Sequence, residues 1–230
     1  MGLGTSPRLA IRTAFDKRDH NANIAVMDAQ EDLRSRKSAP ARIAHILDVA
    51  DQLVIEAGAL PISMKKVGDL MGASRALVYA YFPDPDRLAE AMLERQMRWL
   101  AEAGLDQATG ANEAAEFGAR ALACAHLYLN HVARRGPVIH IAVRDLPRAR
   151  SGAARAHIGV LGRLARAARR DLRLGAHEAL VLLELLVAIP EEAGRLVFEG
   201  SLDLESAQAL CARLLTSSID SVRPRAGRAA

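Results

Sequence analysis

Residues 62–82, ISMKKVGDLMGASRALVYAYF, decide the fold of this chain. Ser63 and Ser74 each precede a short segment that can form a helix, and a serine hydroxyl accepts hydrogen bonds from the free amides at a helix N-terminus. Gly72 lies between the two segments and permits the left-handed backbone that ends a helix and turns the chain. The apolar contacts of the two helices are expected from Val67, Leu70, Leu77, Val78 and Phe82.

An apolar stripe precedes this stretch, and a helix-breaking segment follows it. In residues 43–57 apolar side chains recur every three or four positions, which predicts a helix that Gly58 ends. Pro83 and Pro85 interrupt the chain, and Asp84 can cap a further helix over residues 84–103. Two short capped helices joined by a tight turn predict a helix-turn-helix, whose second helix enters the major groove of DNA. An ordinary helical hairpin in an all-α core fits the short stretch as well.

Residues 42–88 taken together resemble the DNA-binding region of TetR-type bacterial transcriptional regulators. The matching pieces are I-L-x-x-A at 46–50, E-A-G at 56–58, G-A-S at 72–74 and V-Y-x-Y-F-P at 78–83. They cover about a fifth of the chain. The resemblance implies an all-α fold of about nine helices, with an N-terminal three-helix domain that contains the helix-turn-helix and a C-terminal helical domain for ligand binding and dimerisation.

The remaining chain divides by composition and periodicity. Residues 1–38 lack a sustained period and are expected to be a flexible extension, 39–87 the DNA-binding domain, 88–222 the effector and dimerisation domain, and 223–230 a disordered tail. Arg34, Arg36 and Lys37 are either part of a solvated tail or an arm that reaches into a neighbouring minor groove.

Helical periodicity covers most of the C-terminal part. Helices are predicted over residues 112–135, 136–146, 151–172, 176–199 and 204–219, with Pro190 kinking or restarting the fourth of them. The last two long helices are the natural dimer surface, because pairing them with their copies as a four-helix bundle buries apolar stripes. The alternative is that these stripes only face the core of their own subunit.

Composition narrows the compartment and the class of protein. The chain has 230 residues and a net charge of +4. Residues 39–103 hold seven basic and nine acidic side chains, which gives this region a net charge of −2. Global charge therefore does not suggest DNA, and binding must rest on locally placed cations and dimerisation. No apolar run is long enough for a membrane span, and the N-terminus lacks a secretory signal pattern. Two cysteines in apolar patterns fit reduced packing residues, so a cytoplasmic location is expected.

Several side chains of the predicted DNA-binding domain can contact DNA. Arg75 can donate two hydrogen bonds to a guanine or hold a phosphate, and Lys65 lies early in a helix, where cations favour phosphate. The resemblance implies backbone contacts for Tyr79 and Tyr81, although either ring can instead pack in the core. The candidate set is Arg42, Ser63, Lys65, Lys66, Ser74, Arg75, Leu77, Tyr79 and Tyr81.

The sequence also departs from the family pattern. Pro85 stands where the family usually has a lysine that clamps the DNA backbone. Ala76 stands where the family usually has a glycine, and Ile62 stands where it often has a threonine. These changes imply a different operator, lower affinity or degraded DNA binding.

Polar groups on otherwise apolar helices are candidates for an effector cavity in the C-terminal domain. A ligand pocket is mostly apolar with a few orienting polar groups, whereas a buried polar group without a ligand is normally hydrogen-bonded in the core. The candidates are Cys124, Tyr128, His131, His140 and Glu184. No spacing typical of a metal site is present, since His126 and His131 face apart on a helix, and no cofactor is expected.

The sequence thus predicts a homodimeric TetR-like regulator, most simply a repressor that a small-molecule effector releases from a palindromic DNA operator. No membrane partner is expected. The alternative is an all-α ligand-binding or scaffolding dimer whose DNA binding is degenerate. An enzyme is not expected, because no catalytic triad pattern, phosphate-binding loop or metal spacing occurs in the sequence.

Overall fold

A computed structural model describes residues 38–111, 115–146 and 152–224. The predicted arm, Arg34, Arg36 and Lys37, and residues 225–230 of the predicted tail lie outside these ranges. The chain divides into two compact units, Met1–His45 and Ile46–Ala230, each of which is described by itself.

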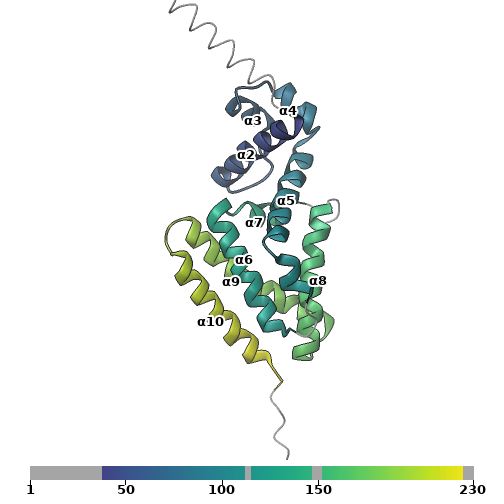
Figure 1. Cartoon of the computed structure of the whole chain (residues 1–230), viewed down its shortest axis with the longest axis vertical. Coiled ribbons are helices and arrows are strands. Elements are labelled where there is room, and N and C mark those ends of the chain that lie inside the picture. The colour runs from purple at the N-terminus through teal and green to yellow at the C-terminus, as the bar shows by residue number, and fades with distance from the viewer. Residues whose placement is uncertain (1–37, 112–114, 147–151, 225–230) are drawn as a thin grey trace, which may run out of the picture. The chain divides into compact units, whose positions relative to one another are not determined.

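The described residues form nine α-helices and one π-helical turn, with no strand among them, which confirms the predicted all-α class (Figure 1). None of these helices is both long enough and apolar enough to span a lipid bilayer. The helices are α2 (Ala39–Ala57), α3 (Met64–Leu70), α4 (Arg75–Tyr81), α5 (Pro85–Glu102), the π-helical turn η1 (Gln107–Ala111), α6 (Phe117–Arg135), α7 (Val138–Asp145), α8 (Gly152–Leu172), α9 (Ala176–Phe198) and α10 (Leu204–Val222).

Three predicted helix caps are confirmed. The Ser63 hydroxyl accepts from the Lys66 amide at the start of α3, and the Ser74 hydroxyl accepts from the Leu77 amide at the start of α4. Asp84 accepts from the Arg87 amide in the same way at the start of α5. These bonds satisfy amides that a helix leaves without a partner in its first turn. The sequence therefore sets the boundaries of α3, α4 and α5 locally.

Gly72 has φ +63°, the left-handed conformation that the sequence predicted for the turn between α3 and α4. One expectation for α3 is wrong. Val67 is fully buried, but Leu70 is 61% exposed, and Met64 supplies the second buried contact instead. A seven-residue helix offers only two turns, and the side chain at 70 falls on the outer side of the last one.

The long helix expected from residue 112 begins later, at Phe117. The Phe117 amide donates to Asp171 Oδ2 of α8 at 2.6 Å, so a distant carboxylate accepts from the first amide of α6. The Arg120 guanidinium reaches back to the carbonyls of Ala115, at 3.0 Å, and Thr109, at 2.8 Å. Tertiary hydrogen bonds thus hold the chain just before Phe117, and periodicity alone does not reveal them.

Two large apolar clusters organise residues 46–224. The first joins α2, α3 and α4 to the N-terminal half of α5 and to α7, and includes Val78, Phe82, Leu88 and Met92. The second joins another face of α5, and part of α7, to α6, α8, α9 and α10. Because α5 contributes to both clusters, it connects the helix-turn-helix to the C-terminal helices.

α9 is the central helix of the C-terminal part and packs against α6, α8 and α10 (Figure 1). Pro190 lies inside α9, which continues to Phe198 without a break, so the predicted restart does not occur. An apolar row on α9 and α10 nevertheless stays exposed, with 66% of Leu185 and 52% of Leu214 accessible. This exposed row contradicts the alternative in which both stripes only face their own core.

Candidate nucleic-acid interface and apolar cavity

α3 and α4 meet closely at Gly68, which the sequence analysis did not single out. A Cβ placed on Gly68 would lie 3.0 Å from the Ala73 carbonyl oxygen and 3.3 Å from the Arg75 amide nitrogen. The Gly68 carbonyl in turn accepts from the Ala73 amide at 2.9 Å. A side chain at 68 would push the two helices apart, so this glycine fixes how α4 is presented. A glycine inside a helical pattern was the available signal.

Arg75 and Tyr79 form one unit on the exposed side of α4. Arg75 Nη2 donates to the Tyr79 hydroxyl at 3.0 Å, and the guanidinium carbon lies 4.9 Å from the centre of the tyrosine ring. Arg75 is exposed, whereas Tyr79 is half-buried and packs against the first cluster. The tyrosine therefore orients the guanidinium, and its remaining donors stay available for a base or a phosphate.

The lysines of α3 differ in their surroundings. Lys65 donates to Asp69 Oδ2 at 2.7 Å in an exposed ion pair, while Lys66 is exposed. Residues 62–82 hold three basic side chains and one acidic one, which gives +2. The helix-turn-helix is thus locally cationic within a region of net negative charge, as phosphate binding requires.

The other candidate contact residues have structural duties as well. The hydroxyls of Ser63 and Ser74 accept capping hydrogen bonds, and Leu77 is half-buried. Tyr81 is half-buried and packs against the first cluster, so core packing accounts for part of its ring. Arg42 lies near the start of α2, within residues 1–45, and is half-buried.

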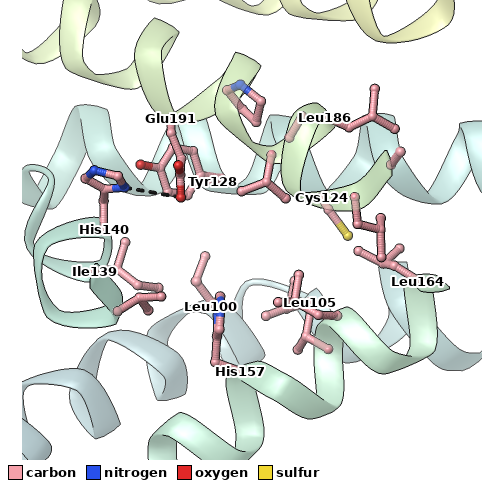
Figure 2. Close-up of a pocket in the computed structure, with 18 of the residues that line it drawn as sticks. Leu100, Leu105, Cys124, Tyr128, Ile139, His140, His157, Leu164, Leu186 and Glu191 are labelled. Carbon is pink, nitrogen blue, oxygen red and sulfur yellow. Dashed lines mark ion pairs between the residues drawn. The ribbon is translucent and has the colours of Figure 1, made fainter. Parts of the chain in front are cut away.

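A cavity of about 130 Å³ lies among α5, α6, α7, α8, α9 and α10 (Figure 2). Its walls are almost entirely apolar, and its polar lining groups are Cys124, Tyr128, His140, His157 and Glu191. Three of the five residues predicted to orient an effector, Cys124, Tyr128 and His140, therefore line one cavity. Burial raises the pKa of the Cys124 thiol to about 11, which keeps it protonated at neutral pH.

Three of the five polar groups, His140, Glu191 and Tyr128, lie close together on one side of the cavity in Figure 2, apart from Cys124 and His157. His140 Nδ1 lies 3.2 Å from Glu191 Oε1, and this hydrogen bond raises the pKa of the imidazole above its usual value. Burial, together with the negative charge of Glu191, raises the pKa of Tyr128. Glu191 was not among the predicted residues, and the sequence placed it just after Pro190 in a helix that was expected to continue to residue 199.

A second hollow, of about 250 Å³, adjoins this cavity and shares six of its lining residues. Glu184 lines the second hollow and is exposed, so it lies outside the inner cavity for which it was predicted. The exposed side chains of Ile158 and Leu180 also line this hollow. The outer hollow therefore lies beside the inner cavity and is bordered by exposed side chains of α8 and α9.

His131, which was predicted to orient an effector, lines neither hollow. Its Nε2 lies 2.6 Å from Gln96 Oε1, and Gln96 Nε2 donates to Asp51 Oδ2 at 2.9 Å. Because the amide oxygen can only accept, Nε2 of His131 carries the proton in this arrangement. His131 is therefore a hydrogen-bonded core residue that connects α6 through α5 to α2.

A salt bridge completes this buried network. Arg95 donates to Asp48 Oδ1 at 2.6 Å and to Asp51 Oδ2 at 2.7 Å, and its guanidinium carbon lies 4.9 Å from the centre of the Trp99 ring. Burial raises the pKa of Asp51 to about 6, against the opposing effect of Arg95. Burial lowers the pKa of His131 to about 4. The network fixes α2 to α5 and α6 at the junction of the two apolar clusters.

α7 makes a second connection between the cavity and the helix-turn-helix. His140 of α7 lines the cavity, while Asp145 at the end of α7 accepts from the Leu60 amide at 2.8 Å. Arg144 Nη2 donates to the Gly58 carbonyl, also at 2.8 Å. The loop at 58–60 leads directly into α3, so a movement of α7 would reach the helix-turn-helix.

Together, these elements define a class of all-α proteins with an exposed helix-turn-helix and a separate apolar cavity among the C-terminal helices. No family model matches the sequence, and a search of curated proteins found no match. Solved structures do match the fold. A TetR-like transcriptional regulator from Rhodococcus sp. RHA1 has a TM-score of 0.59 at 18% identity, over 80% of this chain and 99% of that chain.

Two further structures agree. A putative TetR-family transcriptional regulator from Rhodococcus sp. has a TM-score of 0.57 at 17% identity, over 79% of this chain and 98% of that chain. A TetR-family transcriptional regulator from Bordetella parapertussis 12822 has a TM-score of 0.56 at 19% identity, over 77% of this chain and 94% of that chain. The chain therefore has the fold of TetR-family transcriptional regulators.

Proposed function

We propose that this protein is a TetR-family transcriptional regulator, a homodimer that binds a two-fold DNA operator and is released from it by a small molecule. The observation that carries the proposal is the exposed side of α4, where Tyr79 orients the guanidinium of Arg75. The local charge of +2 on residues 62–82 supports contact with phosphates.

A DNA-binding measurement tests this proposal. Duplexes are selected from a random library with the full-length protein, and affinities for the selected site are measured by fluorescence anisotropy at two salt concentrations. Arg75→Ala is expected to lower affinity for the selected site by about 1–3 kcal/mol and to relax its sequence preference. Tyr79→Ala is expected to weaken binding across sequences, because Arg75 loses its orienting partner.

Arg166→Ala is the charge-matched control for Arg75→Ala, because Arg166 is exposed on α8. It should bind the selected site as the unaltered protein does. Full operator affinity in both α4 variants would end the assignment of α4 as the recognition helix. If the selection returns no preferred duplex and salt removes all binding, the alternative of a ligand-binding dimer with degenerate DNA binding is favoured.

The exposed apolar row on α9 and α10 supports the homodimer. Val181 and Leu185 of α9 and Leu210 and Leu214 of α10 are all more than 40% exposed. Pairing two such helices with their copies makes a four-helix bundle and buries these side chains. A two-fold dimer would present two α4 helices to successive major grooves, about 34 Å apart.

Sedimentation tests the dimer. The double substitution Leu185→Glu and Leu214→Glu places four carboxylates in the proposed bundle of a dimer and is expected to yield monomers. Arg169→Glu, on an exposed position of α8, serves as a control that should stay dimeric. A dimer that survives the double substitution would move the interface to another surface.

Release by an effector is proposed to pass through α5 and α7. Met97 and Leu100 of α5 line the cavity, while Leu88 and Met92 of the same helix pack in the cluster of the helix-turn-helix. A ligand that prefers one arrangement of these helices changes the population of DNA-binding dimers by its difference in affinity for the two arrangements. The expected readout is a fall in operator affinity when ligand is added.

A further inference from the structure

We infer that the inner cavity selects an apolar molecule that carries a protonated amine, and discriminates against a molecule of the same shape that carries a carboxylate. This inference rests on the proposed effector role of the cavity and names the chemical class of the effector.

The carboxylates that line the hollows lie on α9, whereas Arg120 and Arg163 act electrostatically on Cys124 elsewhere in the inner cavity. Glu191 lines both hollows, and Glu184 lines the outer one. Among the described lining residues of these two hollows there is no lysine or arginine, and the basic groups are the imidazoles of His140 and His157. The two carboxylates therefore give the part of the hollows along α9 a negative potential that attracts cations.

The polar side of the cavity has the geometry of a site for an ammonium group. Glu191 provides a carboxylate that is only half-buried and has His140 as its neighbour at 3.2 Å. Tyr128, which shares this side of the cavity, has an aromatic ring that passes Gly194 of α9, where an added Cβ would lie 3.1 Å from the ring atom Cε1. A carboxylate beside an aromatic ring holds an ammonium ion by charge and by the cation–π interaction. Burial is the main cause of the raised pKa of the Tyr128 hydroxyl, and the negative charge of Glu191 adds to it.

A carboxylate ligand would meet the opposite conditions. It would lie beside Glu191 in a space with apolar walls, where like charges repel strongly and water screens little. Protonation of His140 would offset one negative charge, but not two. A buried charge without a partner is costly, so an acid would bind weakly or only in its protonated form.

The size of the cavity limits the apolar part of the ligand. A space of about 130 Å³ compares with apolar cavities of roughly 150 Å³ that bind benzene. The adjoining hollow of about 250 Å³ can take a short chain. A single ring with a short alkylamine arm therefore suits the two hollows, and 4-phenylbutylamine is a suitable probe.

Calorimetry with the full-length protein, in the absence of DNA, tests the inference. The three probes are 4-phenylbutylamine, 4-phenylbutanol and 4-phenylbutyrate, which share one apolar part and differ in charge. The amine is expected to bind at least about tenfold more tightly than the acid, which corresponds to about 1.4 kcal/mol, with the alcohol between them. Equal or tighter binding of the acid, or no detectable binding of the amine at millimolar concentration, would overturn the inference.

Two variants locate the effect. Glu191→Gln should reduce the preference for the amine over the acid to less than about threefold. Glu192→Gln is the matched control, because Glu192 is the neighbouring glutamate on α9, pairs with Arg195 and lines neither hollow. It should keep the preference, and thermal unfolding of both variants confirms that they are folded. A preference that survives Glu191→Gln would overturn the assignment of the ammonium site.

The pH dependence provides an independent readout. The groups around His140 are Glu191 from α9, Tyr128 from α6, His157 from α8, and Arg144 and Asp145 on its own helix. As pH rises from 6 to 8, the protonated fraction of His140 falls, although its hydrogen bond to Glu191 raises its pKa, so the positive charge beside Glu191 decreases while the amine stays charged. Amine affinity is expected to rise at least about threefold over this range in the unaltered protein and to stay constant in Glu191→Gln. A fall in affinity over the same range would contradict the site.

Calorimetry without DNA also separates this inference from the proposed function. Selective amine binding with no effect on DNA would keep the site and remove the regulatory role. DNA binding with no amine selectivity would keep the proposed DNA-binding function and remove the ammonium site.

Discussion

Two polar clusters of this protein differ in what surrounds them. In the network of Asp51, Arg95, Gln96 and His131, Gln96 is fully buried, and of these four residues only Asp51 borders a hollow, which lies at the surface. At the polar side of the inner cavity, Tyr128, His140 and Glu191 all border the same apolar space. Both clusters combine a carboxylate with a histidine, yet only in the second do the carboxylate and the histidine line one cavity.

The comparison shows how to distinguish a structural polar group from one that is available to a ligand. Polar atoms enclosed by protein must be satisfied within the fold, since an unpaired buried group is costly. Polar atoms beside a cavity can instead exchange one partner for a ligand. We therefore expect substitutions in the network to change stability strongly, and substitutions at the cavity to change stability little.

The largest expected effect is that of Arg95→Met. This substitution leaves the Asp51 carboxylate, which is 13% exposed, without its cationic partner. Removing one member of a buried pair typically costs about 3–5 kcal/mol of unfolding free energy. Urea denaturation at one fixed protein concentration measures the loss.

Arg98→Met on the same helix is the control for Arg95→Met. Arg98 is exposed, and its replacement should change the free energy of unfolding by less than about 0.5 kcal/mol. Adding Asp51→Asn to Arg95→Met should restore part of the loss, because the uncompensated charge is then absent. Equal, small effects of both arginine variants would show that the salt bridge contributes little.

The second prediction concerns pH, where the two ends of the network act in opposite directions. The folded pKa of Asp51, about 6, lies above its unfolded value of 3.8, so its contribution to stability is complete below 3.8 and is lost as pH rises through 6. The folded pKa of His131, about 4, lies below its unfolded value of 6.5, so its contribution is lost as pH falls from 6.5 to 4. Between pH 4 and 6 the two contributions change with pH in opposite directions, so the free energy of unfolding is expected to change little over this range.

Single substitutions should separate these contributions. As pH falls from 6.5 to 5, His131→Gln is expected to gain about 1–2 kcal/mol of stability, and Asp51→Asn to lose a similar amount, both relative to the double variant. Urea denaturation at several pH values measures the slope of the unfolding free energy against pH for each variant. Slopes of the same sign in the two single variants would contradict the assigned pKa shifts.

The helix-turn-helix was predictable from sequence because its determinants are local. Ser63, Ser74 and Asp84 cap the helices that follow them, and Gly72 turns the chain, all within 62–84. The start of α6 was not predictable, because a carboxylate of α8, 54 positions away, accepts from its first amide. Local chemistry sets the first kind of boundary, and the tertiary structure sets the second.

The candidate site was predictable only in part for a related reason. A polar residue on an apolar helix face marks Tyr128, His131 and His140 equally, but it does not reveal whether its partner is a side chain or empty space. His131 meets Gln96 of α5, and this contact depends on how two helices pack. Glu191 enters the cavity only because α9 continues through Pro190.

The smallest expected effect is that of Tyr128→Phe, which sharpens the comparison at the cavity. The ring keeps its contact with Gly194, and the tyrosine hydroxyl has no hydrogen bond to other described residues. Its removal should therefore change the unfolding free energy by less than about 0.5 kcal/mol, whereas Gln96→Leu, which leaves His131 and Asp51 without their shared partner, should cost about 1–3 kcal/mol. Parallel urea denaturation of the two variants measures both values. A loss above about 1.5 kcal/mol for Tyr128→Phe would make this hydroxyl a structural group, and the distinction between the enclosed network and the open cavity would not hold at that position.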